Sequence, residues 1–139
     1  MIERENLNLD FEYPSERSSF LLGSVALYKR FQQERITNDD IFFYLNALSK
    51  KDIPVYEKGP NPTQVYYKRG ILDKDRKSLK KKGRIINQYR VIPERRRKVE
   101  QELKKTDYVK YLGQIDEFIA SSATSGGSSF PVSNTIYLE

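Results

Sequence analysis

Positive charge is concentrated in one stretch of the chain, and this limits how the chain can fold more than any other feature. Residues 68–105 contain 16 Lys and Arg against 5 Asp and Glu, a net charge of +11. Residues 1–67 carry −2 and residues 106–139 carry −3. Like charges that crowd together repel one another and destabilise a compact state unless an opposite charge compensates them. We therefore expect much of residues 68–105 to lie at the surface, where an anionic partner can reach it.

The size and composition of the chain favour one small domain. Its 139 residues are 37% hydrophobic, enough for a modest core. We expect a single domain over residues 1–120, followed at 121–139 by a flexible Ser/Gly-rich linker and an apolar tail. There is no secretory signal pattern and no apolar stretch that approaches the ~18 residues of a membrane span. The sequence predicts a soluble, intracellular protein without a membrane partner.

The first third of the chain is predicted to form a strand and two helices. Residues 7–13 alternate apolar and polar side chains, which is the pattern of a half-buried strand. Apolar residues then recur at helical spacing over 16–33, where Gly23 either weakens the helix or lets another backbone approach it closely. Thr37 is a good N-cap, with Asp40 three residues later, for a helix that continues to about residue 50.

A β-hairpin is predicted in the middle of the chain. Its strands would cover residues 55–58 and 64–69, on either side of a Gly-Pro-Asn-Pro turn. A helix is expected over residues 72–82, with Gly83 in the position that follows a helix C-terminus. The alternative is one longer helix that runs through Gly83 to Tyr89.

The remaining residues predict one more strand and a last helix. The strand covers residues 84–92, and Pro93 suits the first position of the helix. The apolar residues of the two halves of this helix lie on roughly opposite faces. Either the helix bends near Thr106, or its first half projects from the core into solvent or onto a partner. The predicted fold is a small α+β domain of about four helices, an N-terminal strand and a β-hairpin.

The sequence offers little material for catalysis. It contains no His and no Cys, which excludes Ser-His-Asp and Cys-His catalysis and the usual zinc sites, and no Gly-rich phosphate-binding loop is present. Asp73 with Asp75, or Asp116 with Glu117, could in principle hold Mg²⁺. The first pair is ordinary chemistry for a first helical turn, and the second pair diverges by ~100° around a helix. We expect no enzymatic activity, no metal and no cofactor; a nuclease that uses Asp73 and Asp75 is the weakest alternative.

The basic segment predicts a contact with nucleic acid. Lys and Arg that neutralise phosphates release condensed counterions, and neighbouring aromatic side chains can stack on unpaired bases. We expect contact with the backbone of RNA or DNA inside a larger complex, without base-specific recognition. The predicted phosphate contacts are Lys68, Arg69, Lys77, Lys80, Lys81, Lys82, Arg84, Arg90, Arg95, Arg96, Arg97 and Lys98, and the predicted stacking residues are Tyr66, Tyr67 and Tyr89.

The competing interpretation is that the positive charge belongs to a solvated helical face. It fits residues 94–104, where the pairs Glu94–Lys98, Arg96–Glu100 and Glu100–Lys104 have the i,i+4 spacing of helical ion pairs. It does not fit residues 77–84, which contain no acidic residue.

A second hypothesis is a structural or assembly subunit that binds protein partners or another copy of the chain. The helix expected to end near residue 50 is apolar nearly all round, so it is either buried or an interface. The predicted protein contacts are Phe42, Phe43, Phe130, Tyr137 and Leu138.

The predicted hairpin that follows two helices also resembles part of a winged-helix module. The helix at 38–50 would then be the recognition helix, and its acidic start and apolar body argue against that role.

Overall fold

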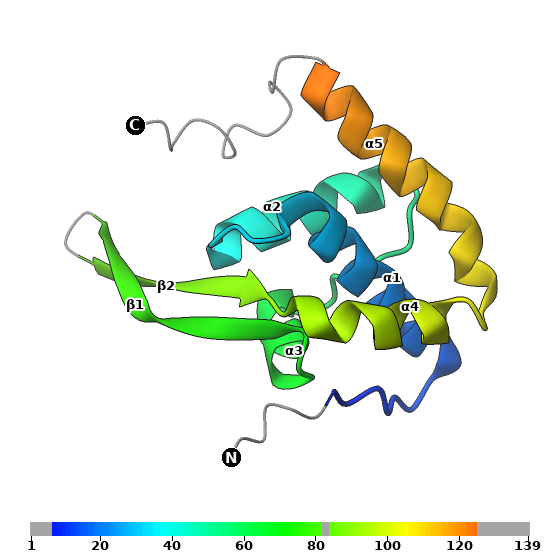
Figure 1. Cartoon of the computed structure of the whole chain (residues 1–139), viewed down its shortest axis with the longest axis horizontal. Coiled ribbons are helices and arrows are strands. Elements are labelled where there is room, and N and C mark those ends of the chain that lie inside the picture. Colours follow the sequence, from blue (N-terminus) through cyan, green and yellow to red (C-terminus); the bar gives the residue numbers. More distant parts are fainter. Residues whose placement is uncertain (1–6, 82–83, 125–139) are drawn as a thin grey trace.

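The computed structural model describes the backbone of residues 7–81 and 84–124, and the side chains of these residues except at 75–81, 84–85 and 123–124. This part of the chain forms five α-helices and one antiparallel β-hairpin (Figure 1). The elements are α1 (Pro14–Phe31), α2 (Asn38–Lys50), α3 (Pro62–Lys68), β1 (Leu72–Lys81), β2 (Arg84–Val91), α4 (Arg96–Leu103) and α5 (Leu112–Thr124), with 3₁₀ turns at Pro93–Arg95 and Asp107–Tyr111. The predicted α+β class is confirmed, with one helix more than expected.

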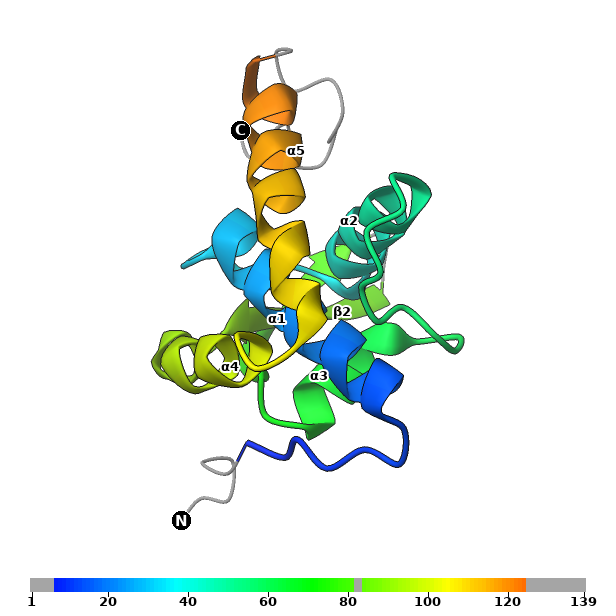
Figure 2. The same ribbon diagram turned by 90° about the vertical axis from the view of Figure 1, so that its right-hand side faces the viewer.

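Helix α1 is the centre of the core. Every residue from Phe20 to Leu27 is buried, which means that other elements cover the middle of this helix on all sides. Figure 2 shows α2, α4 and α5 arranged around it. The helix predicted at 16–33 is confirmed within two residues at each end. Pro14 lies in the first turn, where a backbone N–H has no acceptor within the helix, so the missing N–H of proline costs no hydrogen bond.

Gly23 of α1 lies directly against the side chain of Tyr66 from α3. A Cβ atom at this position would collide with the Tyr66 hydroxyl. Tyr66 has no exposed surface, its Oη donates a hydrogen bond to the Tyr56 carbonyl at 2.8 Å, and its ring stacks on Phe20 at 4.8 Å. The close approach expected at Gly23 therefore exists, but it is made by a side chain and not by another backbone.

Helix α2 begins with the predicted capping box. Thr37 Oγ1 accepts a hydrogen bond from the Asp40 N–H at 3.3 Å, and Asp40 Oδ2 accepts one from the Thr37 N–H at 2.9 Å. One face of α2 is buried, and on that face the Tyr44 hydroxyl donates to the Ala26 carbonyl of α1 at 3.2 Å. Phe42 and Phe43 lie on the other face and are 43% and 45% exposed. Only one side of this apolar helix therefore belongs to the core.

The N-terminal segment is not a strand. Exposure alternates as predicted from Leu7 to Phe11, but no strand among the described residues pairs with this segment, and Tyr13 is 55% exposed. Its carbonyl groups are bound by arginine side chains from elsewhere, chiefly Arg69, whose Nη1 donates to the Asp10 carbonyl at 2.6 Å. Arg17 Nε also donates to the Leu9 carbonyl at 3.1 Å. Side-chain donors thus replace the backbone donors of a sheet.

The predicted hairpin at 55–58 and 64–69 is wrong, and so is the helix predicted at 72–82. Residues 62–68 form α3, for which Pro62 supplies the fixed φ of a first turn, and residues 72–81 form β1. The strand predicted at 84–92 is confirmed as β2, which excludes one helix through Gly83 to Tyr89; Gly83 itself lies outside the described residues. Tertiary contacts outweigh local propensity here, because β2 pairs with β1 on one edge and with Ile36 on the other.

The last predicted helix is divided at Thr106, which confirms the alternative in which it bends near this residue. Thr106 Oγ1 accepts a hydrogen bond from the Tyr108 N–H at 3.1 Å and donates one to the Leu103 carbonyl at 2.8 Å. The other alternative, in which residues 94–105 project from the core, is wrong because Val99 and Leu103 are buried and α4 packs on α1. The predicted contact residues Phe130, Tyr137 and Leu138 lie outside the described residues.

Across the described residues, none of the helices combines the length and the apolar character that are needed to cross a membrane.

Two glycines give opposite predictions for the same substitution. Gly23→Ala should destabilise the fold by about 1–3 kcal/mol, because the new methyl group overpacks the contact with Tyr66. Gly113→Ala, in the first turn of α5, should stabilise it by up to about 1 kcal/mol, because nothing lies within 4 Å of the added Cβ and alanine is the better helix former. Urea unfolding measures both; equal effects would mean that Tyr66 does not hold α3 against α1.

Candidate nucleic-acid interface

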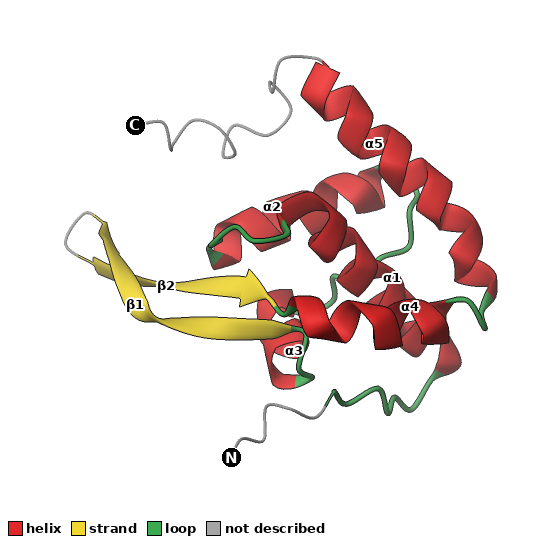
Figure 3. Ribbon diagram, viewed as in Figure 1, coloured by secondary structure: helices red, strands yellow, loops and turns green. Residues whose placement is uncertain are grey.

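The sequence of the β-hairpin carries a strong excess of positive charge. Residues 72–91 contain 8 Lys and Arg against 2 Asp, a net charge of +6. The strands pair from Leu72 opposite Val91 to Lys81 opposite Arg84, with a bulge between Asp75 and Leu79. The hairpin is attached to the core at its base, where Leu72, Tyr89 and Val91 are buried. Figure 3 shows the strands extending from this base beyond the helices.

Five of the twelve predicted phosphate contacts lie on these two strands. Lys77, Lys80 and Lys81 belong to β1, whereas Arg84 and Arg90 belong to β2. Lys82 lies outside the described residues. Arg90 is half-exposed near the base and forms a 3.9 Å ion pair with Asp73 across the strands. The strand register thus places Arg90 opposite Asp73 at the base, at the other end of the hairpin from Lys81 and Arg84.

Helix α4 follows the hairpin directly and carries the second group of predicted contacts. Arg96, Arg97 and Lys98 are exposed, whereas Arg95 is partly buried and its Nη1 donates to the Gly70 carbonyl at 2.7 Å. The Arg96 guanidinium lies over the Tyr28 ring at 4.9 Å. Arg95 thus ties α4 to the base of the hairpin and is only partly available to a ligand.

The three ion pairs that favoured a solvated helical face do not form. All residues of 93–105 are described, and the only ion pair between residues of α4 is Lys98–Glu102, at 3.9 Å. Glu94 and Glu100 make no ion pair with another described residue. The positive side chains at the start of α4 are therefore less compensated than their spacing in the sequence suggests.

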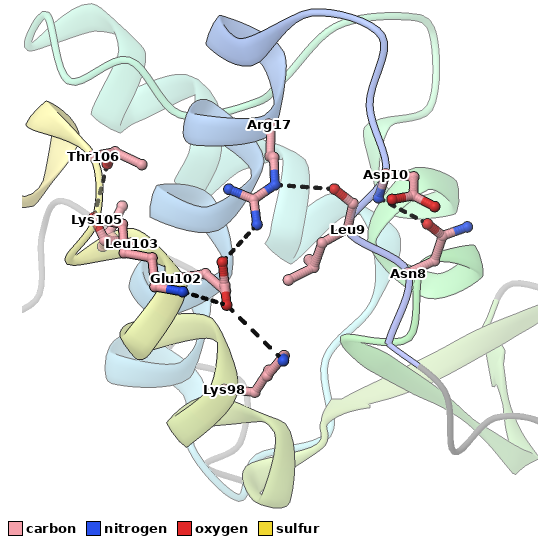
Figure 4. Close-up of polar contacts among 9 residues, drawn as sticks. All are labelled: Asn8, Leu9, Asp10, Arg17, Lys98, Glu102, Leu103, Lys105 and Thr106. Carbon is pink, nitrogen blue, oxygen red and sulfur yellow. Dashed lines mark hydrogen bonds and ion pairs between the residues drawn. The ribbon is translucent and has the colours of Figure 1, made fainter.

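Glu102 is instead the acceptor of a small charge cluster that connects α4 to α1. Its carboxylate accepts a hydrogen bond from Arg17 Nη2 at 2.8 Å and one from Lys105 Nζ at 3.4 Å, and Lys98 Nζ lies 3.9 Å away (Figure 4). The hydrogen bond from Arg17 is the largest influence that lowers the pKa of Glu102; partial burial acts in the opposite direction, and Lys105 lowers it further. Lys98 is consequently compensated from within the molecule.

Arg69 is held by the N-terminal segment and is not a free cation. Besides its bond to the Asp10 carbonyl, its Nη1 lies 3.4 Å from both the carbonyl and the side-chain oxygen of Asn8. Its guanidinium also lies 3.6 Å above the Phe11 ring. Lys68, one residue earlier, is exposed. Of the two basic residues at the end of α3, Lys68 is the one that faces solvent.

The three predicted stacking tyrosines belong largely to the core. Tyr66 is fully buried under α1, and Tyr89 is buried at the base of the hairpin, so neither ring presents a face to a base. Tyr67 is half-buried, packs edge-on against Tyr89 at 5.9 Å, and has the Lys74 ammonium 5.2 Å from its ring. The prediction placed Tyr66 and Tyr67 on a surface hairpin; because residues 62–68 form a helix, Tyr66 lies in the core.

Of the carboxylates considered for a metal, Asp73 and Asp116 each pair with a basic side chain, and the side chain of Asp75 lies outside the described residues. No group of three or more His, Cys, Asp or Glu side chains suited to a metal ion occurs in the described part of the chain. Asp73 pairs with Arg90, and Asp116 pairs with Lys29 of α1 at 3.0 Å.

Sequence reasoning missed Gln101 on the outward face of α4, and Lys104 and Lys105 in the turn that follows the helix. All three are exposed, on the side of the helix opposite Val99 and Leu103. The buried pair at i and i+4 was the signal that could have identified this outward face.

Comparison with protein families, with curated proteins and with solved structures found no match to this chain.

The Glu102 cluster gives a pH-dependent prediction. Because the folded-state pKa of Glu102 lies below the ordinary 4.5, its contribution to stability is present above about pH 4.5 and is lost as the pH falls through the folded-state pKa. Glu102→Gln should lower the free energy of unfolding at pH 7 by on the order of 1 kcal/mol, a modest value because the pair is partly exposed. The difference between variant and wild type should shrink as the pH falls below about 4.5.

Urea unfolding at a series of pH values measures this difference. The matched control is Glu117→Gln on α5, an exposed carboxylate that makes no ion pair with any residue described. A difference for Glu102→Gln that stays constant with pH would mean that the residue acts through packing and not through its charge.

Proposed function

We propose that this chain is a non-enzymatic nucleic-acid-binding protein that contacts the phosphate backbone with its β-hairpin and with α4, as part of a larger complex. The observation that carries the proposal is the hairpin: residues 72–91 include 8 Lys and Arg against 2 Asp, and the strands extend beyond the helices from a base that is packed on the core (Figure 3). Such an excess of positive charge on a projecting ribbon is costly to the folded chain unless an anion compensates it.

The geometry of the hairpin suits a nucleic-acid groove. A two-stranded β-ribbon is one of the two elements that the major groove of B-form DNA admits. The ten residues of β1 correspond to a ribbon of up to about 30 Å, which is the length of roughly nine base pairs. Several phosphates of one duplex therefore lie within reach of the same hairpin.

The order of elements supports the proposal by analogy. Three helices followed by a hairpin, with Ile36 bridging to Tyr89 as a third, minimal strand, is the connectivity of a winged-helix module. The acidic start and apolar body that argue against a recognition helix belong to α2, whereas the helix directly before the hairpin is α3. The only exposed cation on α3 is Lys68. The loop between α2 and α3 has 11 residues, which is longer than the turn of a helix-turn-helix. The analogy therefore extends to the architecture and the wing, and not to a recognition helix.

Salt titration tests the proposal. Binding of the full chain to duplex DNA, duplex RNA and single-stranded RNA oligomers should weaken steeply as salt rises, because each phosphate contact displaces counterions. Lys80→Glu with Lys81→Glu should reduce affinity by at least about tenfold and flatten the salt dependence. The matched control is Lys50→Glu with Lys51→Glu, an adjacent exposed lysine pair at the end of α2. The proposal fails if the wild-type chain binds none of these oligomers, or if both double variants weaken binding equally.

The second candidate function is assembly with a protein partner, and the exposed face of α2 favours it. Phe42 and Phe43 are adjacent, and each leaves more than 40% of its surface in solvent. Large apolar side chains that stay exposed together are typical of interaction surfaces.

Light scattering on the full chain tests this candidate. If the face is an interface between copies, the wild-type protein should be larger than a monomer, and Phe42→Ser with Phe43→Ser should reduce it to monomers, because the apolar contact is lost. Tyr13→Ser, which alters the other large exposed aromatic side chain, is the control. A wild-type monomer would exclude self-association through α2.

A further inference from the structure

We infer that α4 is a base-contacting helix that enters the major groove of B-form duplex DNA, with Arg97 and Gln101 touching base edges and Lys104 at the end of the same stripe. This inference rests on the proposed function, and it adds the class of nucleic acid and the source of sequence preference. Arg97, Gln101 and Lys104 have the spacing i, i+4, i+7, which places them along one side of the helix.

The stripe faces solvent and is free to bind. Val99 and Leu103 anchor the opposite side of α4 in the core, whereas Arg97, Gln101 and Lys104 are all exposed. None of these three side chains makes a hydrogen bond or ion pair with another residue that the structure describes. Figure 2 places α4 at the edge of the molecule, with no other helix or strand outside it.

The side chains on this face are those that distinguish base pairs in a major groove. Arginine forms two hydrogen bonds with the O6 and N7 atoms of guanine, glutamine forms two with adenine, and a carboxylate accepts one from the amino group of cytosine. Arg97 and Gln101 provide the first two, and Glu94 and Glu100, which line the same shallow surface, provide the third. A helix that only held phosphates would carry cations here and would not keep two acidic residues beside them.

The dimensions agree with a short contact in a wide groove. A helix with its side chains is about 10–12 Å across, and the major groove of B-form DNA is about 12 Å wide. Arg97 and Lys104 are seven residues apart, about 10 Å along the axis, which corresponds to about three base pairs. The major groove of A-form RNA is too deep and narrow for side chains to read its bases, so the helix favours DNA.

The attachment of α4 gives it the rigidity that base contacts need. Arg95 bonds to the Gly70 carbonyl at its N-terminal end, and Glu102 bonds to Arg17 of α1 near its C-terminal end. Only residues 92–95 separate α4 from β2, so hairpin and helix can lie on one duplex. Phosphate contacts by the hairpin would then set the position of the helix along the groove.

The test starts from a pool of DNA duplexes with ten randomised central base pairs, selected on the full-length wild-type chain. We expect an enriched sequence that binds at least about tenfold more tightly than a scrambled duplex of the same composition. Gln101→Ala and Arg97→Lys should each reduce this preference by about 5- to 150-fold or abolish it, because each removes a two-bond contact with a base. Gln101→Ala leaves every charge of the protein in place, so its binding to the scrambled duplex should stay as in the wild type. Arg97→Lys keeps the charge but not the paired hydrogen bonds, so its salt dependence should stay as in the wild type.

The control is Gln114→Ala, an exposed glutamine on α5, which should leave the preference unchanged. If DNA binding is strong and salt-dependent but no sequence is enriched, or if the preference survives both α4 variants, the inference about α4 is overturned while the proposed function stands. Equal binding to the duplex RNA of the enriched sequence overturns the assignment to DNA. Absence of binding to any of these duplexes overturns the inference and the proposed function together.

Discussion

The contact between Tyr66 and Gly23 determines where the proposed binding surface begins. Because position 23 lacks a side chain, the Tyr66 ring lies directly against α1 and stacks on Phe20. The backbone of Tyr66 is thereby fixed, and its carbonyl accepts a hydrogen bond from the Ile71 N–H at 2.9 Å. Ile71 in turn accepts one from the Ile92 N–H at 2.9 Å, where β2 ends. One close contact in the core thus fixes the start of β1, the end of β2 and, through them, the start of α4.

Charges in this chain separate into those that the fold uses and those that it leaves to solvent. Arg17, Arg69 and Arg95 hold the N-terminal segment, α4 and the hairpin base through carbonyl oxygens and Glu102. Each of these arginines is partly buried, and its hydrogen bonds hold together segments that are distant in the sequence. In contrast, Arg97 and Lys104 are exposed and make no ion pair with any other described residue. A count of basic residues cannot separate these two groups, because the difference lies in burial and partners.

Sequence reasoning succeeded where a local interaction decides the structure. The capping box of Thr37 and Asp40, the division at Thr106 and the extent of α1 are all encoded within a few neighbouring residues. It failed for residues 55–82, where the outcome depends on distant partners. The acidic start at Asp73 and Asp75 is compatible with a helix, but the strand forms because Leu72 pairs opposite Val91 and because Ile36 pairs with Tyr89 on the far edge of β2.

The same distinction applies to the candidate site. The net charge of the sequence is enough to place the candidate contacts within residues 68–105. It is not enough to predict which partners each of these side chains has in the fold. Arg69, a predicted phosphate contact, donates hydrogen bonds to the N-terminal segment, and Tyr66, a predicted stacking residue, lies in the core. The sequence alone does not mark Gln101 as a contact residue, because it is a neutral residue in a charged run. It becomes notable only when a helix places it between Arg97 and Lys104 on an exposed face.

The proposed hairpin and helix contacts have different physical consequences, and neither could replace the other. Contacts with phosphate give affinity without sequence information, and the hairpin has the charge for them. The outward face of α4 is closer to neutral, since Glu94 and Glu100 lie beside Arg96, Arg97 and Lys104, so we expect its phosphate contacts to add less affinity than those of the hairpin. Its value would lie in discrimination, about 1–3 kcal/mol for each two-bond contact with a base. Under this proposal, the hairpin alone would bind duplexes without regard to sequence. Helix α4 alone would bind too weakly to select one sequence over another.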